Sequence, residues 1–328
     1  MNFDPLVLAL SGSALPIAAA ALLVERLFGY PNGPQAWIGH PVQWMGALIG
    51  LLDHMLNTGK ACKLRGIFTL QIIALITLVI TVPLTLFLRG QTSGWVAELL
   101  LASTLLSQKS LEDHVRAVAD GLKQNMKNAR EAVAHIIGRD PGALDESGVT
   151  KGALESLAEN MSDGVLAPLF WLLIAGLPGI ALYKAINTAD SMIGYKSDKY
   201  HDFGWATARV DDLANLIPAR LTGWLIALAA SFIKGFSGRA ALRAMASDAP
   251  EHLSPNAGWP EAALAGALGI QLGGPRSYQE RKVDLPSMGT GRSKLEREDI
   301  ERGLRLYNTG LNILTAFVIS ACIIRWMI

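Results

Sequence analysis

The sequence predicts an all-α, polytopic integral membrane protein with about four or five transmembrane helices. Three observations support this fold class. The chain of 328 residues is 51% hydrophobic and only 17% charged, whereas soluble proteins carry roughly 25% charged residues. Its mean hydropathy is +0.30. Several uncharged segments also approach the ~20 residues that a helix needs to cross the hydrocarbon core of a bilayer.

The first expected span covers residues 6–24, which carry no charge. A secretory signal would begin with basic side chains. The residues before this span instead include Asp4 and no Lys or Arg. We therefore expect a retained membrane anchor, followed by a shorter apolar stretch at residues 41–56.

The second expected span covers residues 66–88, the clearest uncharged segment of the chain. Basic residues precede it at Lys60, Lys63 and Arg65. Cytoplasmic loops are enriched in such residues, so this loop is expected in the cytoplasm.

Residues 107–163 are expected to form a cytoplasmic helical insertion. From residue 107 to 137, apolar residues recur every three or four positions, which predicts one amphipathic helix. A second helix is expected from about residue 150 to 161, ending at Ser162-Asp163-Gly164.

The remaining expected spans lie near residues 164–183, 213–233 and 306–324. The first of them is interrupted by Gly176-Leu177-Pro178-Gly179, which predicts a re-entrant or broken helix. Without a long linker in the chain, residues 1–328 are expected to form a single integral membrane domain.

Three acidic residues stand beside the span at 164–183. Glu155, Glu159 and Asp163 are spaced i, i+4 and i+8, so the first pair shares a helix face. Like charges repel at this spacing, whereas Mg²⁺ takes oxygen ligands of this kind. A magnesium site is one interpretation, and a solvated helix face with scattered acids is the other.

A second polar cluster follows the glycine-proline break. Lys184, Asn187 and Asp190 are spaced i, i+3 and i+6. Ionisable groups next to membrane segments are costly and usually functional. The cluster continues with charged residues that offer cations for phosphate and carboxylates for metal, namely Arg209, Asp211, Asp212 and Arg220. An ordinary polar loop with internal salt bridges is the alternative.

Several function classes lack support. With 29 basic and 28 acidic residues the net charge is +1, so nothing favours nucleic acid. Cys62 and Cys322 support neither a disulfide framework nor a zinc site. No P-loop motif is present. Gly273-Gly274-Pro275-Arg276 and Gly289-Thr290-Gly291-Arg292 could each wrap a phosphate, but each is more simply a turn.

Several long blocks resemble the CobD/CbiB family of adenosylcobinamide-phosphate synthases, and the likeness spans nearly the whole chain. These blocks are residues 153–171, 187–196, 202–212, 217–221 and 254–262, with His40-Pro41-Val42 near the start. One departure is Glu25 to Pro31, where the family's early acidic-Gly-Asp-Pro pattern is not reproduced. Nothing catalytic is assigned to that stretch.

The resemblance implies an ATP-dependent condensation in cobalamin biosynthesis. The carboxylate of adenosylcobyric acid would be joined to the amine of (R)-1-amino-2-propanol O-phosphate, or of a related amino alcohol, to give adenosylcobinamide phosphate. Such chemistry needs Mg²⁺ and cations around the phosphates of ATP and a base for the ammonium proton.

Roles for individual residues follow from this implied reaction. The catalytic candidates are Glu155, Glu159 and Lys184, with Glu155 as the base. The candidates for holding ATP or the amino alcohol phosphate are Asn187, Tyr195, Lys196, Arg209 and Arg220. The candidate Mg²⁺ ligands are Glu159, Asp163, Asp190, Asp211 and Asp212.

The expected setting is a bacterial inner membrane, with the site facing the cytoplasm because ATP is available there. The expected partners are the corrinoid and amino alcohol phosphate substrates and the bilayer, with a homo-oligomer or other corrin-pathway membrane enzymes as further candidates. Two rival functions stay open. One is a transporter, which the predicted broken helix would suit, and the other is a non-enzymatic membrane sensor or assembly partner.

Overall fold

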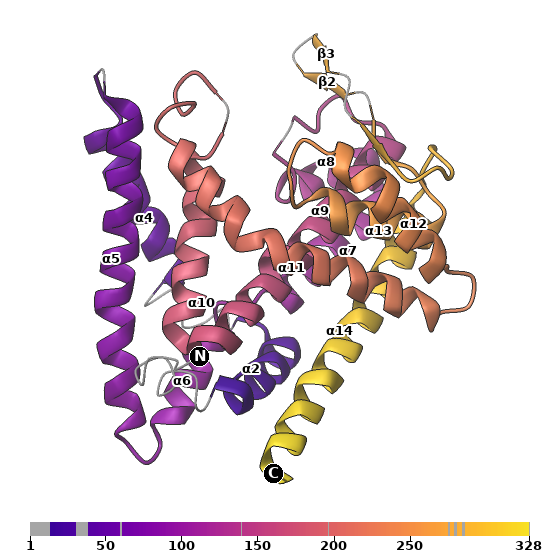
Figure 1. Cartoon of the computed structure of the whole chain (residues 1–328). Helices are drawn as coiled ribbons and strands as arrows, with labels where there is room; N and C mark the ends of the chain where they lie inside the picture. The colour runs from indigo at the N-terminus through magenta and orange to yellow at the C-terminus, as the bar shows by residue number, and fades with distance from the viewer. Residues whose placement is uncertain are drawn as a thin grey trace. The chain divides into compact units, whose positions relative to one another are not determined.

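The computed structural model describes residues 14–30, 39–59, 61–138, 140–195, 197–274, 276–278, 281–283 and 286–327. These residues are helical apart from a few short strands (Figure 1), which confirms the predicted all-α fold. The chain divides into two compact units: unit 1 is Met1–Ser107, Ala167–Asn215 and Val318–Ile328, and unit 2 is Gln108–Leu166 and Leu216–Phe317. The expectation of one integral membrane domain stays a prediction.

Unit 1 is built from apolar helices. They are α2 (Ala14–Phe28), α4 (Pro41–Leu56), α5 (Cys62–Arg89), α6 (Gly94–Ser103), α10 (Ala167–Ile193) and the first turns of α11 (Trp205–Ser231). The start of α4 is fixed by a capping box. The Val42 N–H donates to Nδ1 of His40 over 3.1 Å, and the His40 N–H donates to the Gln43 side chain over 2.9 Å. This pairing satisfies N–H groups that a helix start leaves without partners.

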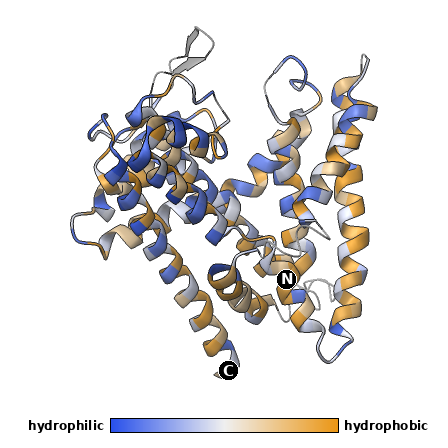
Figure 2. Cartoon of the chain, turned by 180° about the vertical axis from the view of Figure 1, so that it is seen from behind, coloured by the Kyte–Doolittle hydropathy of each residue, from blue (hydrophilic) through white to orange (hydrophobic). Residues whose placement is uncertain are grey.

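Helix α5 presents an apolar surface outward along most of its length (Figure 2). Its side chains remain largely exposed within the chain, including Leu75 at 62%, Val79 at 62% and Phe87 at 65%. An exposed apolar surface of this extent would be unfavourable in water, and it fits contact with lipid.

Four helical stretches among the described residues are long and apolar enough to cross a membrane. They are Cys62–Arg89, Glu146–Ile193, Trp205–Ser231 and Arg297–Met327. The first, second and fourth contain the spans expected near residues 66–88, 164–183 and 306–324. The third contains residues 213–231 of the span expected near residues 213–233. Of the span expected at residues 6–24, residues 6–13 lie outside the described residues and the rest belongs to α2.

Helix α10 is broken where the sequence predicts it. Ala175 and Gly176 have non-helical backbone angles, and Gly176 has φ +63°. Glycine adopts this left-handed conformation without the strain that a side chain would add. The prediction of a broken helix is therefore confirmed.

The α-helix expected to end at Ser162-Asp163-Gly164 ends at Asn160, but the chain does not leave the helical path there. Helix α9 (Glu146–Asn160) passes into a π-helical turn, η1 (Met161–Leu166), which leads directly into α10. The wider i→i+5 turn accommodates these residues within a continuous helical path. Such π turns are frequent at functional sites.

Unit 2 contains the polar helices. They are α7 (Gln108–Gln124), α8 (Met126–Ala134), α9, α12 (Gly238–Asp248), the 3₁₀ turn η2 (Ala249–Glu251), α13 (Gly258–Leu268) and most of α14 (Arg297–Met327). The single helix predicted for residues 107–137 is wrong, because α7 and α8 are separate. Asn125 adopts an extended backbone and its side chain accepts the Asn128 N–H over 2.9 Å, which starts a new helix.

Short strands lie between α13 and α14. Strand β1 (Leu272–Gly273) pairs antiparallel with β4 (Ser287–Met288), with Leu272 opposite Met288. Strand β2 (Arg276–Tyr278) pairs antiparallel with β3 (Arg281–Val283). These strands were not predicted from the sequence, because they are too short to show a periodic pattern.

Candidate functional site

A buried polar cluster joins α10 to the first turns of α11 in unit 1. The Asp211 residue is only 7% exposed. The Asn187 side-chain amide donates to Asp211 Oδ1 over 3.3 Å, and the Asn215 amide donates to Oδ2 over 3.0 Å. The Tyr183 hydroxyl donates to Asn215 Oδ1 over 2.9 Å. The cluster therefore arranges its donors around one carboxylate.

Lys184 supplies a positive charge to this cluster. The residue is 9% exposed and acts electrostatically on Asp211 and on His40. Burial, followed by the charge of Lys184, lowers the pKa of His40 below its usual value of 6.5. The lowered pKa keeps His40 neutral near pH 7, and Lys184 is the cation that acts on Asp211. Burying an ammonium and a carboxylate in an apolar unit costs free energy, and groups retained at such a cost are usually functional.

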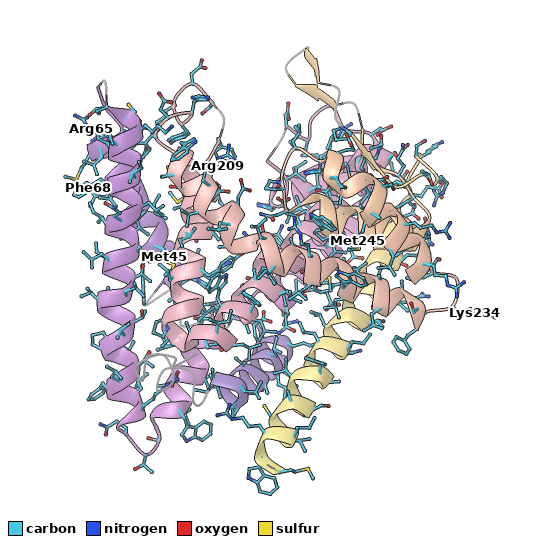
Figure 3. All side chains as sticks on the ribbon, in the orientation of Figure 1. Met45, Arg65, Phe68, Arg209, Lys234 and Met245 are labelled. Atoms are coloured by element: carbon cyan, nitrogen blue, oxygen red, sulfur yellow. The ribbon has the colours of Figure 1, made fainter. Side chains whose placement is uncertain are left out.

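Other predicted site residues of unit 1 lie close to this cluster in the sequence. Asp190 lies one turn after Asn187 and is partly buried, as is Asp212. Tyr195 is 56% exposed. Arg209 is exposed on the first turns of α11 (Figure 3). Lys196 lies outside the described residues.

In unit 2, Glu155 is buried and has a defined contact. Its Oε1 accepts the N–H of Gly273 over 2.8 Å, and the residue is 7% exposed. One turn earlier on α9, the Lys151 ammonium donates to the Gly273 carbonyl over 3.2 Å. Together these side chains hold strand β1 on α9, so Glu155 contributes to the fold whatever else it does.

Glu159 and Asp163 have different surroundings from Glu155. Glu159 is exposed near the end of α9, whereas Asp163 is partly buried in the π-helical turn. Among the described residues, no three or more His, Cys, Asp or Glu side chains gather as a metal cage. Mg²⁺ in nucleotide sites needs only one or two carboxylates, because phosphates and water supply the other ligands. Asp211 is one buried carboxylate whose two oxygens are held in place by side-chain amides.

A second group of functional candidates lies around the start of α13 in unit 2. The Arg220 guanidinium stacks 4.4 Å from the centre of the Trp259 ring. His252 Nε2 lies 3.8 Å from Oε1 of Glu261, which is 5% exposed. The cation–π contact and a hydrogen bond from Nη1 to the Leu216 carbonyl, 2.7 Å long, together orient the Arg220 guanidinium.

Asp211 and Arg220 are predicted site residues, whereas their neighbours Asn215, Trp259, Glu261 and Tyr183 were not predicted from the sequence. Asn215 lies four residues after Asp211, a spacing that places both on one helix face and could have identified it. Trp259 and Glu261 fall within the block at residues 254–262, which carried the family resemblance but received no role. Tyr183 had no signal beyond its position beside Lys184.

Comparisons with known proteins agree over nearly the whole chain. The model of the family described as CobD/Cbib protein matches residues 18–307. Cobalamin biosynthesis protein CobD of Rhodobacter capsulatus is 46% identical over 310 residues, which cover 94% of this chain and 97% of that protein. The CobD protein of Sinorhizobium fredii is 47% identical over 307 residues, covering 92% and 94%. That of Brucella anthropi is 44% identical over 325 residues, covering 96% and 98%. No solved structure matches the chain.

Proposed function

The chain belongs to the CobD/CbiB family of cobalamin biosynthesis proteins, and we propose that it catalyses the ATP-dependent joining of adenosylcobyric acid to an amino alcohol phosphate. The amine substrate is (R)-1-amino-2-propanol O-phosphate or a close relative. The product is adenosylcobinamide phosphate, in which an amide bond links the two. The observation that carries this proposal is the buried carboxylate of Asp211, held by amides beside the Lys184 ammonium.

The reaction needs an activated acid, because a carboxylate and an amine do not condense in water. The substrate carboxylate attacks the γ-phosphorus of ATP, giving an acyl phosphate and ADP. The amine then attacks the acyl carbon, the C–O bond to phosphate breaks, and inorganic phosphate leaves. A base takes the proton that the nitrogen loses.

Lys184 and Arg209 are our candidates for the phosphates of ATP. An ammonium in an apolar environment interacts more strongly with developing negative charge than it would in water. Asn187 lies one turn from Lys184 and already orients Asp211. Tyr195 and Lys196 come shortly after Asn187 in the sequence and complete the proposed set of nucleotide-binding residues.

In unit 1, Asp211 together with Asp190 or Asp212 would hold Mg²⁺. Glu159 and Asp163 in unit 2 are separate candidate ligands. When bound, Mg²⁺ would neutralise charge on the phosphates of ATP. The amide donors of Asn187 and Asn215 fix the positions of the two Asp211 carboxylate oxygens, which are the atoms that would bind a cation.

The proposed acid–base and anchoring groups include residues of unit 2. Glu155 is the proposed base, with Glu159 as the alternative. Arg220, stacked on Trp259, is the proposed anchor for a phosphate or carboxylate oxygen. Arginine held in a fixed plane suits such bidentate contacts.

We further propose a multi-pass placement in a bacterial inner membrane with the site open to the cytoplasm, where ATP is available. The four candidate spans support a multi-pass protein. The basic residues Lys63 and Arg65 at the start of α5 support a cytoplasmic position for that end of the helix.

The test is a reconstituted reaction with the full chain in lipid nanodiscs. Adenosylcobyric acid, the amino alcohol phosphate, ATP and Mg²⁺ are combined, and mass spectrometry follows the corrinoid. We expect the mass of the amide product, dependent on ATP and on Mg²⁺. Asp211→Asn and Lys184→Met are expected to reduce kcat by about 10²-fold or more, as removal of an electrostatic group does in comparable sites.

Asp202→Asn is the matched control, because Asp202 is an exposed acid between α10 and α11 that pairs only with the exposed His201 among the described residues. It should retain full activity. Absence of product with corrinoid still bound would point to a sensor or assembly role. Absence of both product and binding would favour a transporter.

A further inference from the structure

Unit 2 contains a pocket of about 270 Å³ that the proposed reaction does not yet use. Its walls are helices α12 and α13 and the turn that follows strand β4. Most of its lining is small, and four residues give it polar character: Arg243, Ser247, Asp248 and Thr290. The volume is open because Ala244, Ala265 and Gly266 carry little or no side chain.

One part of the pocket suits an anion. Arg243 is exposed and makes no ion pair with any carboxylate of the described residues. The backbone N–H groups of Thr290 and Gly291, in the turn on the opposite wall, donate no hydrogen bond within the described part of the chain. A guanidinium and adjacent backbone N–H groups are the usual donors to phosphate oxygens.

Another part of the pocket suits a cation. Asp248 is partly buried at the end of α12. Its Oδ2 accepts the Gly289 N–H over 2.6 Å and its Oδ1 accepts the Ser247 hydroxyl over 2.5 Å. These donors fix the position of the Asp248 carboxylate. Gly269 caps the end of α13, and the carboxyl end of a helix also favours positive charge.

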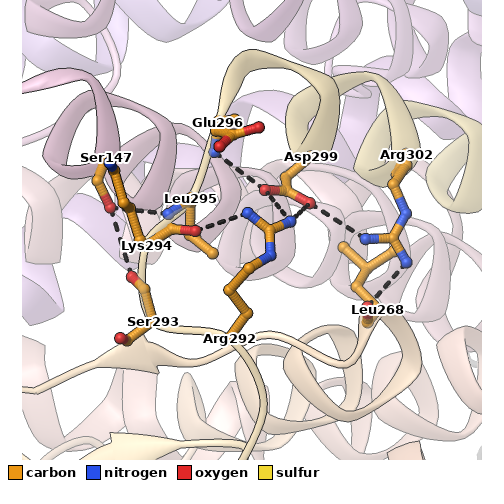
Figure 4. Close-up of polar contacts among 9 residues, drawn as sticks. All are labelled: Ser147, Leu268, Arg292, Ser293, Lys294, Leu295, Glu296, Asp299 and Arg302. Carbon is orange, nitrogen blue, oxygen red and sulfur yellow. Dashed lines mark hydrogen bonds and ion pairs between the residues drawn. The ribbon is translucent and has the colours of Figure 1, made fainter.

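Arg292, the arginine that the sequence places beside Gly289-Thr290-Gly291, does not serve this pocket. Its guanidinium donates to both oxygens of Asp299, over 2.8 and 2.9 Å, and to the Lys294 carbonyl (Figure 4). Asp299 also accepts from Arg302, which donates to the Leu268 carbonyl at the end of α13 (Figure 4). This network anchors two walls of the pocket. Because Arg292 and Arg302 are bound to Asp299, Arg243 is the cation that lines the pocket.

We propose that the pocket binds a small molecule that carries a phosphate monoester at one end and an ammonium group at the other. The phosphate would contact Arg243 and the N–H groups of Thr290 and Gly291, and the ammonium would contact Asp248. A phosphate alone would be repelled by Asp248, and an amine alone would be repelled by Arg243. This inference rests on the proposed function, whose amine substrate is a phosphorylated amino alcohol of this class.

The test measures binding to the full chain in nanodiscs by isothermal titration calorimetry. The probes are 1-amino-2-propanol O-phosphate, isopropyl phosphate, which lacks the amine, and 1-amino-2-propanol, which lacks the phosphate. The zwitterion should bind most tightly. Arg243→Gln should weaken it by about tenfold or more, the effect of losing one charge-assisted hydrogen bond. Asp248→Asn, which can still accept the Gly289 N–H, should abolish the preference over isopropyl phosphate.

Two further variants of α12 serve as controls. Arg239→Gln removes an exposed arginine one turn earlier that does not line the pocket, and it should leave all affinities unchanged. Arg243→Lys keeps the charge and should retain most of the affinity. The proposal is overturned if Arg243→Gln binds the zwitterion as tightly as Arg239→Gln does.

Kinetics separate this inference from the proposed function. If the ligase reaction occurs, Arg243→Gln should raise the KM for the amine substrate and leave the KM for ATP unchanged. Product formation with equal amine KM values in Arg243→Gln and Arg239→Gln would refute the pocket alone. Binding with the expected pattern but no amide product would refute the proposed reaction alone.

Discussion

Replacing Asp299 by alanine should destabilise unit 2 more than any other single loss of charge at the start of α14. Asp299 is 1% exposed and receives hydrogen bonds from Arg292, from Arg302 and from the N–H of Glu296 (Figure 4). Asp299→Ala would leave two arginines facing each other without their shared carboxylate.

The expected magnitude follows from the exposure of the partners. Breaking a buried ion pair by removing one partner typically costs about 3–5 kcal/mol. The side chains of Arg292 and Arg302 are 46% and 31% exposed, so water solvates part of each guanidinium once Asp299 is gone. We therefore expect the lower end of the range, about 3 kcal/mol.

Denaturation of the purified protein in mixed detergent micelles, followed by tryptophan fluorescence, measures this change. The control is Glu298→Gln, which removes the neighbouring acid, 61% exposed and paired with Arg297. Exposed pairs of this kind contribute little to stability, because water screens the two charges. If Asp299→Ala destabilised the protein no more than Glu298→Gln, the network would not be a stabilising element and the pocket walls would need another support.

Two other predictions concern unit 1. Gly66→Ala would place a Cβ 1.9 Å from a backbone carbonyl oxygen of the segment before α11, and this overpacking should lower the free energy of unfolding by about 3 kcal/mol or more. Gly50→Ala, whose Cβ would meet no atom within 4 Å, is the control and should be neutral or stabilising in the same denaturation assay. Burial alone would raise the pKa of Asp53, but hydrogen bonds led by Lys199 outweigh it and hold this pKa below 3.8. The stabilisation that ionised Asp53 contributes should therefore be complete above about pH 4 and lost as the pH falls through the lowered pKa. The free energy of unfolding measured from pH 6 to pH 3 should fall more steeply in the native protein than in Asp53→Asn. Equal slopes would contradict this prediction.

The membrane helices could be predicted from sequence because hydropathy is a local property that accumulates along a segment. The span expected at residues 66–88 lies within Cys62–Arg89, and the break at Gly176 follows from glycine and proline alone. The helix that contains the span expected at residues 306–324 begins earlier, at Arg297. Its first turns are polar and belong to unit 2, where ion pairs such as Arg292 with Asp299 replace apolar contacts.

Features that depend on tertiary contacts could not be predicted in the same way. Asn125 separates α7 from α8 by capping, although the apolar repeat continues through it in the sequence. Arg292 stands next to a glycine-rich turn, which suggested a phosphate contact, but Asp299 lies seven residues later and holds its guanidinium. Asp211 could be identified as a site candidate, whereas the network around it required the pairing of α10 with α11.

Glu155 illustrates why a residue type and its spacing do not assign a role. As the proposed base it needs a carboxylate, but its contact with the Gly273 N–H needs only an oxygen acceptor. Glu155→Gln keeps that acceptor and removes the basicity. We expect this variant to retain the stability of the native protein and to lose about 10²-fold or more in kcat, as the loss of a general base does, while Glu155→Ala should lose stability as well. Full activity of Glu155→Gln would restrict Glu155 to holding strand β1 and would move the proposed base to Glu159.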